Sequence, residues 1–281
     1  MTFVPLSFAH QQAIETACHR LALPINEYSF TTLYLYRQDD QSEFFEHPQG
    51  YHWIRGIIRQ KDIFAMPLFH PTDWEESLSF AKEAGAAYLF PICEAWTREI
   101  SNHRIEFDED EADYCFDRMT IQKYAGRHFD GVRNWVRRLL AAHTMRVEPY
   151  TVAHFEEAQA IITAWDQGRK NSLTDASQCR EAAQLADRLR LEGYIFYAED
   201  RAVGLLLGEP LLMDMFVIHF AKAVPGYPGI YQYMYAHLAT RLSSQFRWLN
   251  WEQDLGIERL RKAKHVYRPT MFSWKAKVFV E

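Results

Sequence analysis

The order of predicted helices and strands in the C-terminal half constrains the fold more than any other feature of the chain. Apolar residues three and four apart predict helices, and short runs rich in β-branched and aromatic residues predict strands. The pattern gives helices at 154–165 and 176–191, strands at 194–198, 202–208 and 214–221, a helix at 230–243, a strand at 247–251, a helix at 257–264 and a strand at 271–280. This mixture indicates an α/β (α+β) fold with mixed sheets flanked by helices.

The order strand, two helices, three strands, helix, strand, helix, strand is that of an acyltransferase domain of the GNAT type. The N-terminal half is compatible with a degenerate copy, with a helix at 8–21, strands at 51–58 and 63–67, a helix at 73–84 and a strand at 88–91, although no sequence repeat is visible. The element order is therefore compatible with a degenerate domain over 1–126, a bridging helix over 127–145 and a C-terminal domain over 146–281 that carries the probable site. The bridging helix would be amphipathic, with one apolar face made of Val132, Trp135, Val136, Leu139 and Leu140.

Composition excludes several classes of protein. The chain has 281 residues, of which 48% are hydrophobic and 15% aromatic, so it is not a disordered chain and has room for two medium domains. No apolar run approaches the length of a membrane span, and the N-terminus does not resemble a signal peptide. The four cysteines include no Cys-x-x-Cys pair, which argues against structural zinc and disulfides. We expect a cytoplasmic protein with no metal and no transmembrane segment.

Charge is unevenly distributed along the chain, whose net charge is -6. Residues 106–117 hold seven acids, residues 118–146 hold seven bases and one acid, and the last 41 residues hold nine bases and four acids. Local basic surfaces on an acidic protein suggest a site for an anion. The alternative is that these residues form ordinary solvated helix faces.

Three segments resemble a known family. They are Pro24-Ile25-Asn26-Glu27-Tyr28-Ser29-Phe30-Thr31-Thr32-Leu33; Asp113-Tyr114 with Tyr124-Ala125-Gly126-Arg127-His128-Phe129 and Arg133-Asn134; and the 15 residues from Asn250 to Lys264, closed by Tyr267 and Pro269. Together they resemble stand-alone bacterial proteins similar to the C-terminal catalytic domain of phosphatidylglycerol lysyltransferase. The resemblance implies tandem GNAT-like domains and transfer of an aminoacyl group from aminoacyl-tRNA to a hydroxyl or amine.

The resemblance also bears on individual residues and on the acceptor. Positions that match the family pattern are His219, Lys222, Gly229, Tyr231, Asn250, Glu252, Asp254, Gly256, Leu260, Arg261, Lys262 and Lys264. The sequence has no counterpart of the integral membrane half of the lysyltransferases. This departure from the family counts against a lipid acceptor. The expected acceptor is a small molecule, a peptide or a lipid headgroup.

A donor would bind at the loop before the 230–243 helix, where Gly226 and Gly229 allow close backbone approach and the helix N-terminus offers free N–H groups. Pro225 and Pro228 in the same loop remove N–H donors, and the acetyl-CoA signature Gln/Arg-x-x-Gly-x-Gly/Ala is absent. The alternative is a plain turn. Basic residues that suit a donor's phosphates or carboxylate are Lys222, Arg133, Arg261, Lys262 and Lys264, unless they only face water.

Catalytic candidates follow from the third segment and the third strand. Glu252 and Asp254 alternate, so in an extended chain both carboxylates would point to one side and either could take a proton from the acceptor. Capping, or pairing of Asp254 with Arg261 or Lys264, is the alternative. His219 is a second candidate base, or else a hydrogen-bonded core residue. Tyr231 is a candidate proton donor or stacking platform, or else part of the core.

These residues lead to one principal expectation for function and two alternatives. We expect an acyltransferase that uses an aminoacyl-tRNA-type donor, with tRNA as a partner and no tightly bound cofactor. One alternative is an acyl-CoA-dependent N-acyltransferase. The other is a non-catalytic, metabolite-binding GNAT-like protein.

Overall fold

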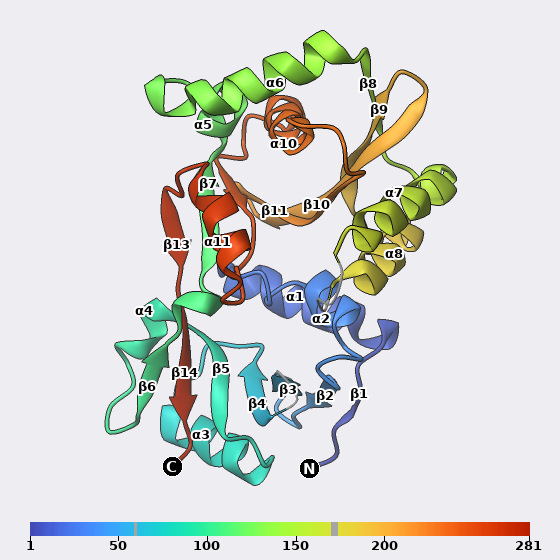
Figure 1. Ribbon diagram of the computed structural model, residues 1–281. Coiled ribbons are helices and arrows are strands. Elements are labelled where there is room, and N and C mark those ends of the chain that lie inside the picture. Colours follow the sequence, from blue (N-terminus) through green and yellow to red (C-terminus); the bar gives the residue numbers. More distant parts are fainter. Residues whose placement is uncertain (59–60, 170–173) are drawn as a thin grey trace. The chain divides into compact units, whose positions relative to one another are not determined.

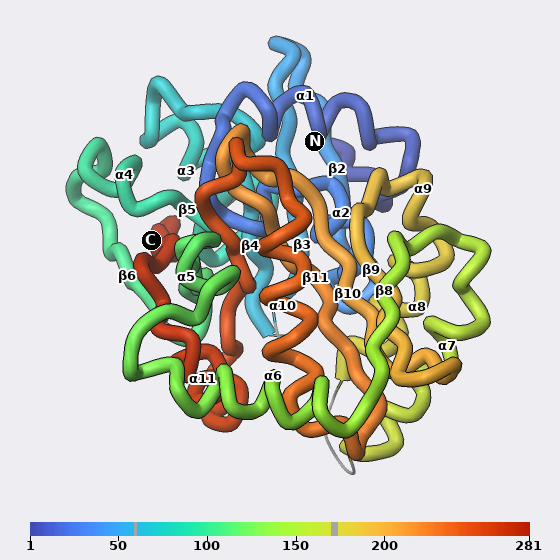
Figure 2. The backbone as a smooth tube through the Cα atoms, turned by 90° about the horizontal axis from the view of Figure 1, so that it is seen from above, coloured from blue at the N-terminus to red at the C-terminus, as the bar shows by residue number. Residues whose placement is uncertain are grey.

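The computed structural model describes residues 1–58, 61–169 and 174–281, and the chain divides into two compact units (Figure 1). Unit 1 consists of Met1–Tyr114, Gln253–Lys262 and Phe272–Glu281, and unit 2 of Cys115–Glu252 and Ala263–Met271. The tube in Figure 2 follows the chain through both units. Each unit is described by itself below.

Unit 1 is built on a seven-stranded sheet in the order β1-β2-β3-β4-β5-β14-β6. Its strands are β1 (Val4–Pro5), β2 (Glu43–Glu46), β3 (His52–Ile58), β4 (Asp62–Pro67), β5 (Tyr88–Cys93), β6 (Ile105–Phe107) and β14 (Lys275–Phe279), and its helices are η1 (Phe8–His10), α1 (Gln11–Leu21), α2 (Phe30–Leu35), α3 (Trp74–Glu83), α4 (Glu94–Thr97) and η2 (Glu109–Glu111). Strands β4 and β5 are parallel, and α3 connects them. Helix α3 begins where the Asp73 carboxylate accepts the Glu76 N–H, and it buries Leu78 and Ala81.

Unit 2 is built on a second seven-stranded sheet in the order β13-β7-β12-β11-β10-β9-β8. Its strands are β7 (Asp113–Asp117), β8 (Met145–Pro149), β9 (Glu192–Ala198), β10 (Arg201–Leu212), β11 (Met215–Ala223), β12 (Trp248–Asn250) and β13 (Met271–Ser273), and its helices are α5 (Arg118–Lys123), η3 (Arg127–Phe129), α6 (Asp130–Ala142), η4 (Val152–His154), α7 (Phe155–Gln167), α8 (Ala176–Gln184), α9 (Ala186–Leu189) and α10 (Ile230–Arg241). Three elements cross the division between the units. Helix α11 (Glu258–His265) begins in unit 1 and ends in unit 2, the first two residues of β7 are assigned to unit 1, and so are the last two of β13.

Helix α10 shows how the second sheet is covered. The expected apolar stripe is buried at Ile230, Met234 and Leu238, where the helix packs on β9, β10 and β11. Gly204 in β10 permits this approach, because a Cβ there would lie 2.9 Å from Met234 Sδ. Helices α5 and α6 pack in turn on α10 (Figure 1).

The two sheets repeat one topology. The order β2-β3-β4-β5-β14-β6 in unit 1 corresponds to β9-β10-β11-β12-β7-β13 in unit 2. Each sheet has one parallel pair among the strand registers of the described residues, which is β4–β5 in unit 1 and β11–β12 in unit 2. The connection between the two parallel strands contains a long helix, α3 in unit 1 and α10 in unit 2. The structure therefore confirms the mixed α/β class and the tandem GNAT-like arrangement. Only the sheet order reveals the duplication that the sequence does not show.

Exchange of the last strands changes the expected domain boundaries. Strand β7, from the N-terminal half, lies beside β12, and β14, from the C-terminus, lies beside β5. The expected strand at 271–280 is thus two strands in different sheets, and 272–281 belong to unit 1 rather than to the C-terminal domain. The first boundary falls at 114 instead of 126 because β7 pairs in the second sheet.

The expected bridging helix exists as η3 and α6 but belongs to unit 2. Its apolar face is only partly covered: Val132 and Leu139 are buried, whereas Trp135 and Leu140 are 42% and 49% exposed. Periodicity located the helix, and packing on α10 decided which of its apolar residues are buried.

In unit 1, Tyr28 fills the point where β4 and β5 separate. The two strands pair only at Phe64–Tyr88 and Ala65–Leu89. The buried Tyr28 hydroxyl then lies 3.3 Å from the carbonyl oxygen of Pro67 and 3.0 Å from that of Pro91, on the diverging strand ends. A side chain of the protein itself thus occupies this gap, which agrees with a degenerate N-terminal copy.

We expect Tyr28→Phe to lower the free energy of unfolding by about 1–2 kcal/mol, because two buried carbonyl groups lose their donor while the ring remains. Urea unfolding measures the difference. Tyr51→Phe is the matched control, because Tyr51 is only half-buried and its hydroxyl makes no hydrogen bond within the described residues. An unchanged midpoint for Tyr28→Phe would contradict this account of the gap.

Candidate functional site

In unit 2 the central parallel pair also opens, and two of the candidates, His219 and Glu252, meet there. Strand β12 pairs with β11 only at Met215, Phe216 and Val217, so β11 continues from 218 to 223 past its last pairing with β12. Ligands in open α/β sheets bind where neighbouring strands diverge. The opening between β11 and β12 is therefore the first place to look for a site.

A β-bulge on β11 displays His219 at this opening. Leu207 pairs with Phe220 and Gly208 with Ile218, which leaves His219 as the extra residue. Gly208 makes the bulge possible, since a Cβ there would overlap the Val217 carbonyl oxygen. Bulges of this kind re-aim a side chain, and here that side chain is the one the sequence singled out.

His219 bridges two carboxylates. Its Nδ1 lies 2.8 Å from Glu252 Oε1 and its Nε2 lies 3.1 Å from Glu209 Oε1. Burial lowers the pKa of His219, but the hydrogen bonds with Glu209 and Glu252 outweigh it and raise the pKa to about 10. At neutral pH His219 is thus a cation that donates both N–H groups, and it does not fit the expected role of a proton acceptor.

The trio of Glu209, His219 and Glu252 carries one negative charge in excess. The His219 side chain is 3% exposed, whereas those of Glu209 and Glu252 are 16% and 18% exposed. The two carboxylates are therefore partly accessible to a ligand, while the buried imidazolium is hydrogen-bonded to both of them. Such an arrangement suits an ammonium group, or a nucleophile that must lose a proton.

Glu252 and Asp254 do not form the expected pair. Glu252 has φ 58°, so the segment is not extended and the alternation argument fails. Its N–H bonds to Asn250 Oδ1 at 2.7 Å, and buried Lys264 donates to the carbonyl oxygens of Trp251 at 2.7 Å and Glu252 at 2.9 Å. Lys264 fixes this loop and is not available to a donor's phosphates.

Asp254 is fully buried in unit 1 and holds a network of its own. It accepts from Tyr114 at 2.5 Å, from Arg261 Nε at 2.7 Å and from the Gly256 N–H at 2.9 Å. Burial alone would raise the pKa of Asp254, but the bonds from Arg261, Tyr114 and Gly256 outweigh it and hold the pKa below its usual value. The pairing alternative fits Asp254 better than proton transfer.

Arg261 also explains part of the uneven charge. Its guanidinium bonds to Asp110 Oδ1 at 2.5 Å as well as to Asp254. A basic residue of the C-terminal segment is thus matched by an acidic residue of the 106–117 run, inside unit 1. The uneven distribution of charge in the sequence could not distinguish such an internal ion pair from a binding site for an anion.

The remaining basic candidates have partners too. Buried Lys222 lies 2.7 Å from both carboxylate oxygens of Asp175 and 4.0 Å above the Trp165 ring. Arg133 bonds to the Tyr124 carbonyl and to Asp130, and exposed Lys262 pairs with Glu258 at 2.6 Å. The structure thus does not gather Lys222, Arg133, Arg261, Lys262 and Lys264 into one donor-binding patch.

The loop before α10 contains the two glycines singled out from the sequence, and at Gly229 the structure gives a packing reason for glycine instead of ligand approach. Gly226 and Gly229 have φ of 101° and 94°. A Cβ on Gly229 would overlap the Trp135 carbonyl oxygen, so this glycine lets α6 approach the start of α10. A Cβ on Gly226 would meet nothing within 4 Å, so its positive φ, and not a close contact, favours glycine there. Half-buried Tyr231 lies in the first turn of α10, its ring 6.5 Å from that of Tyr235.

Sequence reasoning missed Glu209 and Asp175. Glu209 interrupts an otherwise apolar strand directly after Gly208, and a lone acid at such a place signals a specific partner. Asp175 begins a helix, and its contact with Lys222 joins residues 47 apart in the chain, which no local pattern indicates. Tertiary contacts placed both.

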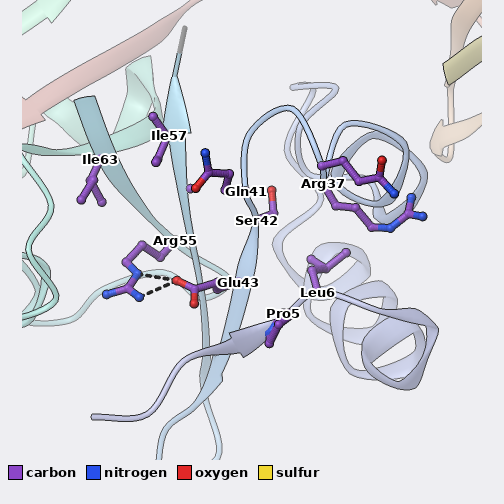
Figure 3. Close-up of a pocket in the computed structure, with 11 residues that line it drawn as sticks. Pro5, Leu6, Arg37, Gln41, Ser42, Glu43, Arg55, Ile57 and Ile63 are labelled. Carbon is purple, nitrogen blue, oxygen red and sulfur yellow. Dashed lines mark hydrogen bonds and ion pairs between the residues drawn. The ribbon is translucent and has the colours of Figure 1, made fainter. Parts of the chain in front are cut away.

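Unit 1 also contains a hollow of about 580 Å³ (Figure 3). Pro5, Leu6, Ser42, Ile57 and Ile63 line it together with polar residues of β2, β3 and the loop after α2. Its arginines are already engaged: Arg55 is paired with Glu43 and Arg37 lies 3.7 Å over the Tyr34 ring. None of the residues expected at the site lies here.

Among residues 1–58, 61–169 and 174–281, no three histidine, cysteine, aspartate or glutamate side chains are placed to hold a metal ion together. Within the same ranges, no helix has both the length and the apolar character needed to cross a bilayer.

Comparison with known proteins settles the family. Residues 20–275 match the profile of the family described as phosphatidylglycerol lysyltransferase, C-terminal. The chain belongs to this family. Family and fold together indicate a transferase of the lysylphosphatidylglycerol synthase and GNAT type. No curated protein matches the sequence.

Solved structures agree on the fold. A conserved protein of unknown function from Bacteroides thetaiotaomicron is similar over 99% of both chains, with 20% identity and a TM-score of 0.87. The C-terminal domain of a putative lysylphosphatidylglycerol synthetase from Agrobacterium fabrum is similar over 96% of this chain and 92% of that one, with 12% identity and a TM-score of 0.63. The structure of L-PGS from Bacillus licheniformis is similar over 88% of this chain and 90% of that one, with 14% identity and a TM-score of 0.59.

Proposed function

We propose that unit 2 transfers an aminoacyl group from an aminoacyl-tRNA-type donor to an amine or hydroxyl acceptor. The observation that carries the proposal is the trio of Glu209, His219 and Glu252 at the opening between β11 and β12, with its excess negative charge. An aminoacyl ester carries an α-ammonium group, which this charge would attract and orient. The acyl group of acetyl-CoA carries no such cation.

The chemistry needs one proton acceptor and one leaving group. The acceptor's nitrogen or oxygen attacks the ester carbonyl carbon, a new C–N or C–O bond forms, and the bond to the ribose oxygen of the donor breaks. Glu252 would take the proton of the nucleophile, and the ribose oxygen would leave with a proton, for which Tyr231 in the first turn of α10 is our candidate donor. His219 would hold the two carboxylates without itself exchanging a proton.

Two features weigh against acyl-CoA as donor. Pro225 and Pro228 remove backbone donors from the loop where a pyrophosphate would lie. Lys222, in the strand before the loop, is buried against Asp175 and already neutralised. An acyl-CoA-dependent transfer remains the alternative that the first experiment addresses.

That experiment incubates the protein with a tRNA pool charged with radiolabelled amino acids, or with labelled acetyl-CoA, in the presence of amine, peptide and lipid-headgroup acceptors. Label that moves from tRNA to an acceptor would support the proposal. Label that moves only from acetyl-CoA would establish the alternative. Binding of either donor without turnover would overturn the proposal in favour of a metabolite-binding protein.

We expect Glu252→Gln to reduce kcat/KM for aminoacyl transfer by roughly 10²–10⁴-fold, as for loss of a general base. The matched control is Glu192→Gln, an exposed glutamate at the start of β9 in the same sheet. Initial rates with limiting charged tRNA measure the effect. Equal losses in both variants, or none in Glu252→Gln, would remove Glu252 from the reaction.

A further inference from the structure

Glu252 carries its carboxylate from a loop held in an uncommon backbone conformation. Its φ of 58° lies in the left-handed region, which a residue with a side chain adopts only at a cost in energy. Such a conformation persists where the surrounding contacts impose it. The contacts of this loop therefore decide whether the carboxylate of Glu252 lies against His219.

Lys264, near the end of α11, supplies two of these contacts. Its Nζ donates to the carbonyl oxygen of Trp251 at 2.7 Å and to that of Glu252 at 2.9 Å. The carbon atoms of these two carbonyl groups are the two ends of the φ dihedral of Glu252, so a donor that binds both restricts that angle. Lys264 is 7% exposed, and all three residues belong to unit 2.

The residues before Glu252 have anchors of their own. The Trp251 ring stacks on that of Tyr235, with the ring centroids 4.0 Å apart, and Asn250 Oδ1 accepts the Glu252 N–H at 2.7 Å. With Trp251 held in place, the direction of the Glu252 side chain depends on φ. A change in φ would move Glu252 Oε1 away from His219 Nδ1, which lies 2.8 Å from it.

We propose that Lys264 is a positioning residue for Glu252: by binding the two carbonyl groups it keeps the Glu252 carboxylate against His219 and so preserves the trio. Lys264 acts through the backbone of the loop and needs no contact with a substrate. The consequence for catalysis rests on the proposed function, in which Glu252 takes the proton of the nucleophile. The position of Glu252 itself is tested without any reaction.

The test measures the pKa of His219 by NMR in the full chain labelled with ¹³C-histidine, with the resonance assigned by its loss in His219→Gln. Burial lowers this pKa, and the hydrogen bonds with Glu209 and Glu252 outweigh burial and raise it to about 10. Lys264→Met keeps most of the length of the side chain but removes the donor. We expect it to lower the pKa of His219 by about 1–3 pH units, the usual effect of losing one nearby opposite charge.

The sign of the shift distinguishes positioning from a direct effect of charge. Removal of a cation would by itself raise the pKa of His219, whereas movement of Glu252 away from the ring lowers it. Lys262→Met is the matched control, because Lys262 lies two residues earlier on α11 and its side chain is 73% exposed. It should leave the pKa of His219 unchanged.

A double-variant cycle separates positioning from a general loss of structure. In a chain that already carries Glu252→Gln, Lys264→Met should have little further effect on the pKa of His219. An unchanged pKa in Lys264→Met, or an equal fall with and without Glu252→Gln, would overturn the proposal. If Lys264→Met does not fold, Lys264→Gln, which keeps an N–H donor on a shorter side chain, should show a smaller fall, and the absence of any fall there would count equally against the proposal.

Aminoacyl transfer supplies the second readout. We expect Lys264→Met to reduce kcat/KM by about 10²-fold, because a displacement of about 1 Å at a reacting group costs this much. A full rate in Lys264→Met together with a lowered pKa would remove Glu252 from the reaction and leave the positioning by Lys264 intact. A chain that transfers no aminoacyl group would contradict the proposed function, and the pKa of His219 would still show whether Lys264 positions Glu252.

Discussion

Lys275→Met is expected to lower the free energy of unfolding by about 3–5 kcal/mol, the usual cost of removing one partner from a buried ion pair. The substitution retains most of the side-chain volume but leaves Asp113 and Glu27 close together without a cation in a fully buried place. It also removes the hydrogen bond that links the start of β14 to Asn26. Urea unfolding at pH 7 measures the difference.

Lys277→Met is the matched control, because Lys277 lies two residues further along β14 and is partly exposed, beside the Tyr88 ring. It should change stability by less than about 1 kcal/mol. Similar losses in the two variants would mean that β14 tolerates no substitution and that the buried cluster has no special role.

Raising the pH from 6 to 10 is expected to remove up to about 4–5 kcal/mol of stability through His219 alone. The pKa of His219 is about 10 in the folded protein, against the ordinary value of 6.5 in the unfolded chain. A raised pKa means that the folded state binds the proton more tightly. The contribution is therefore complete below pH 6.5 and is lost as the pH rises through 10.

The difference between wild type and His219→Gln isolates this effect, because glutamine does not titrate and the other titrating groups, Glu27 among them, are present in both proteins. Urea unfolding at pH 6, 8 and 10 should give stability curves that converge as the pH rises. Parallel curves would show that His219 is not held as a cation between Glu209 and Glu252.

Local patterns in the sequence determined most of the helices and strands of unit 2. The apolar stripe of α10 and the runs of β9 to β11 lie within a few residues of where periodicity placed them, because each buries one face against the rest of its sheet. The family segments also contain residues with specific polar contacts. Glu252, Asp254 and Asp113 are all engaged in specific polar contacts.

Tertiary structure decided what those residues do. Whether Glu252 and Asp254 share a side depended on the left-handed conformation of Glu252, and whether Arg261 was available depended on Asp110, which is 151 residues away. Likewise, the strand expected at 271–280 is divided between two sheets at Trp274, which no local preference signals. Burial periodicity is local, so most helices and strands of unit 2 could be predicted from the order of the residues alone. Pairing partners, strand exchange and the charge state of His219 arise from contacts between distant residues, and only the folded chain fixes these.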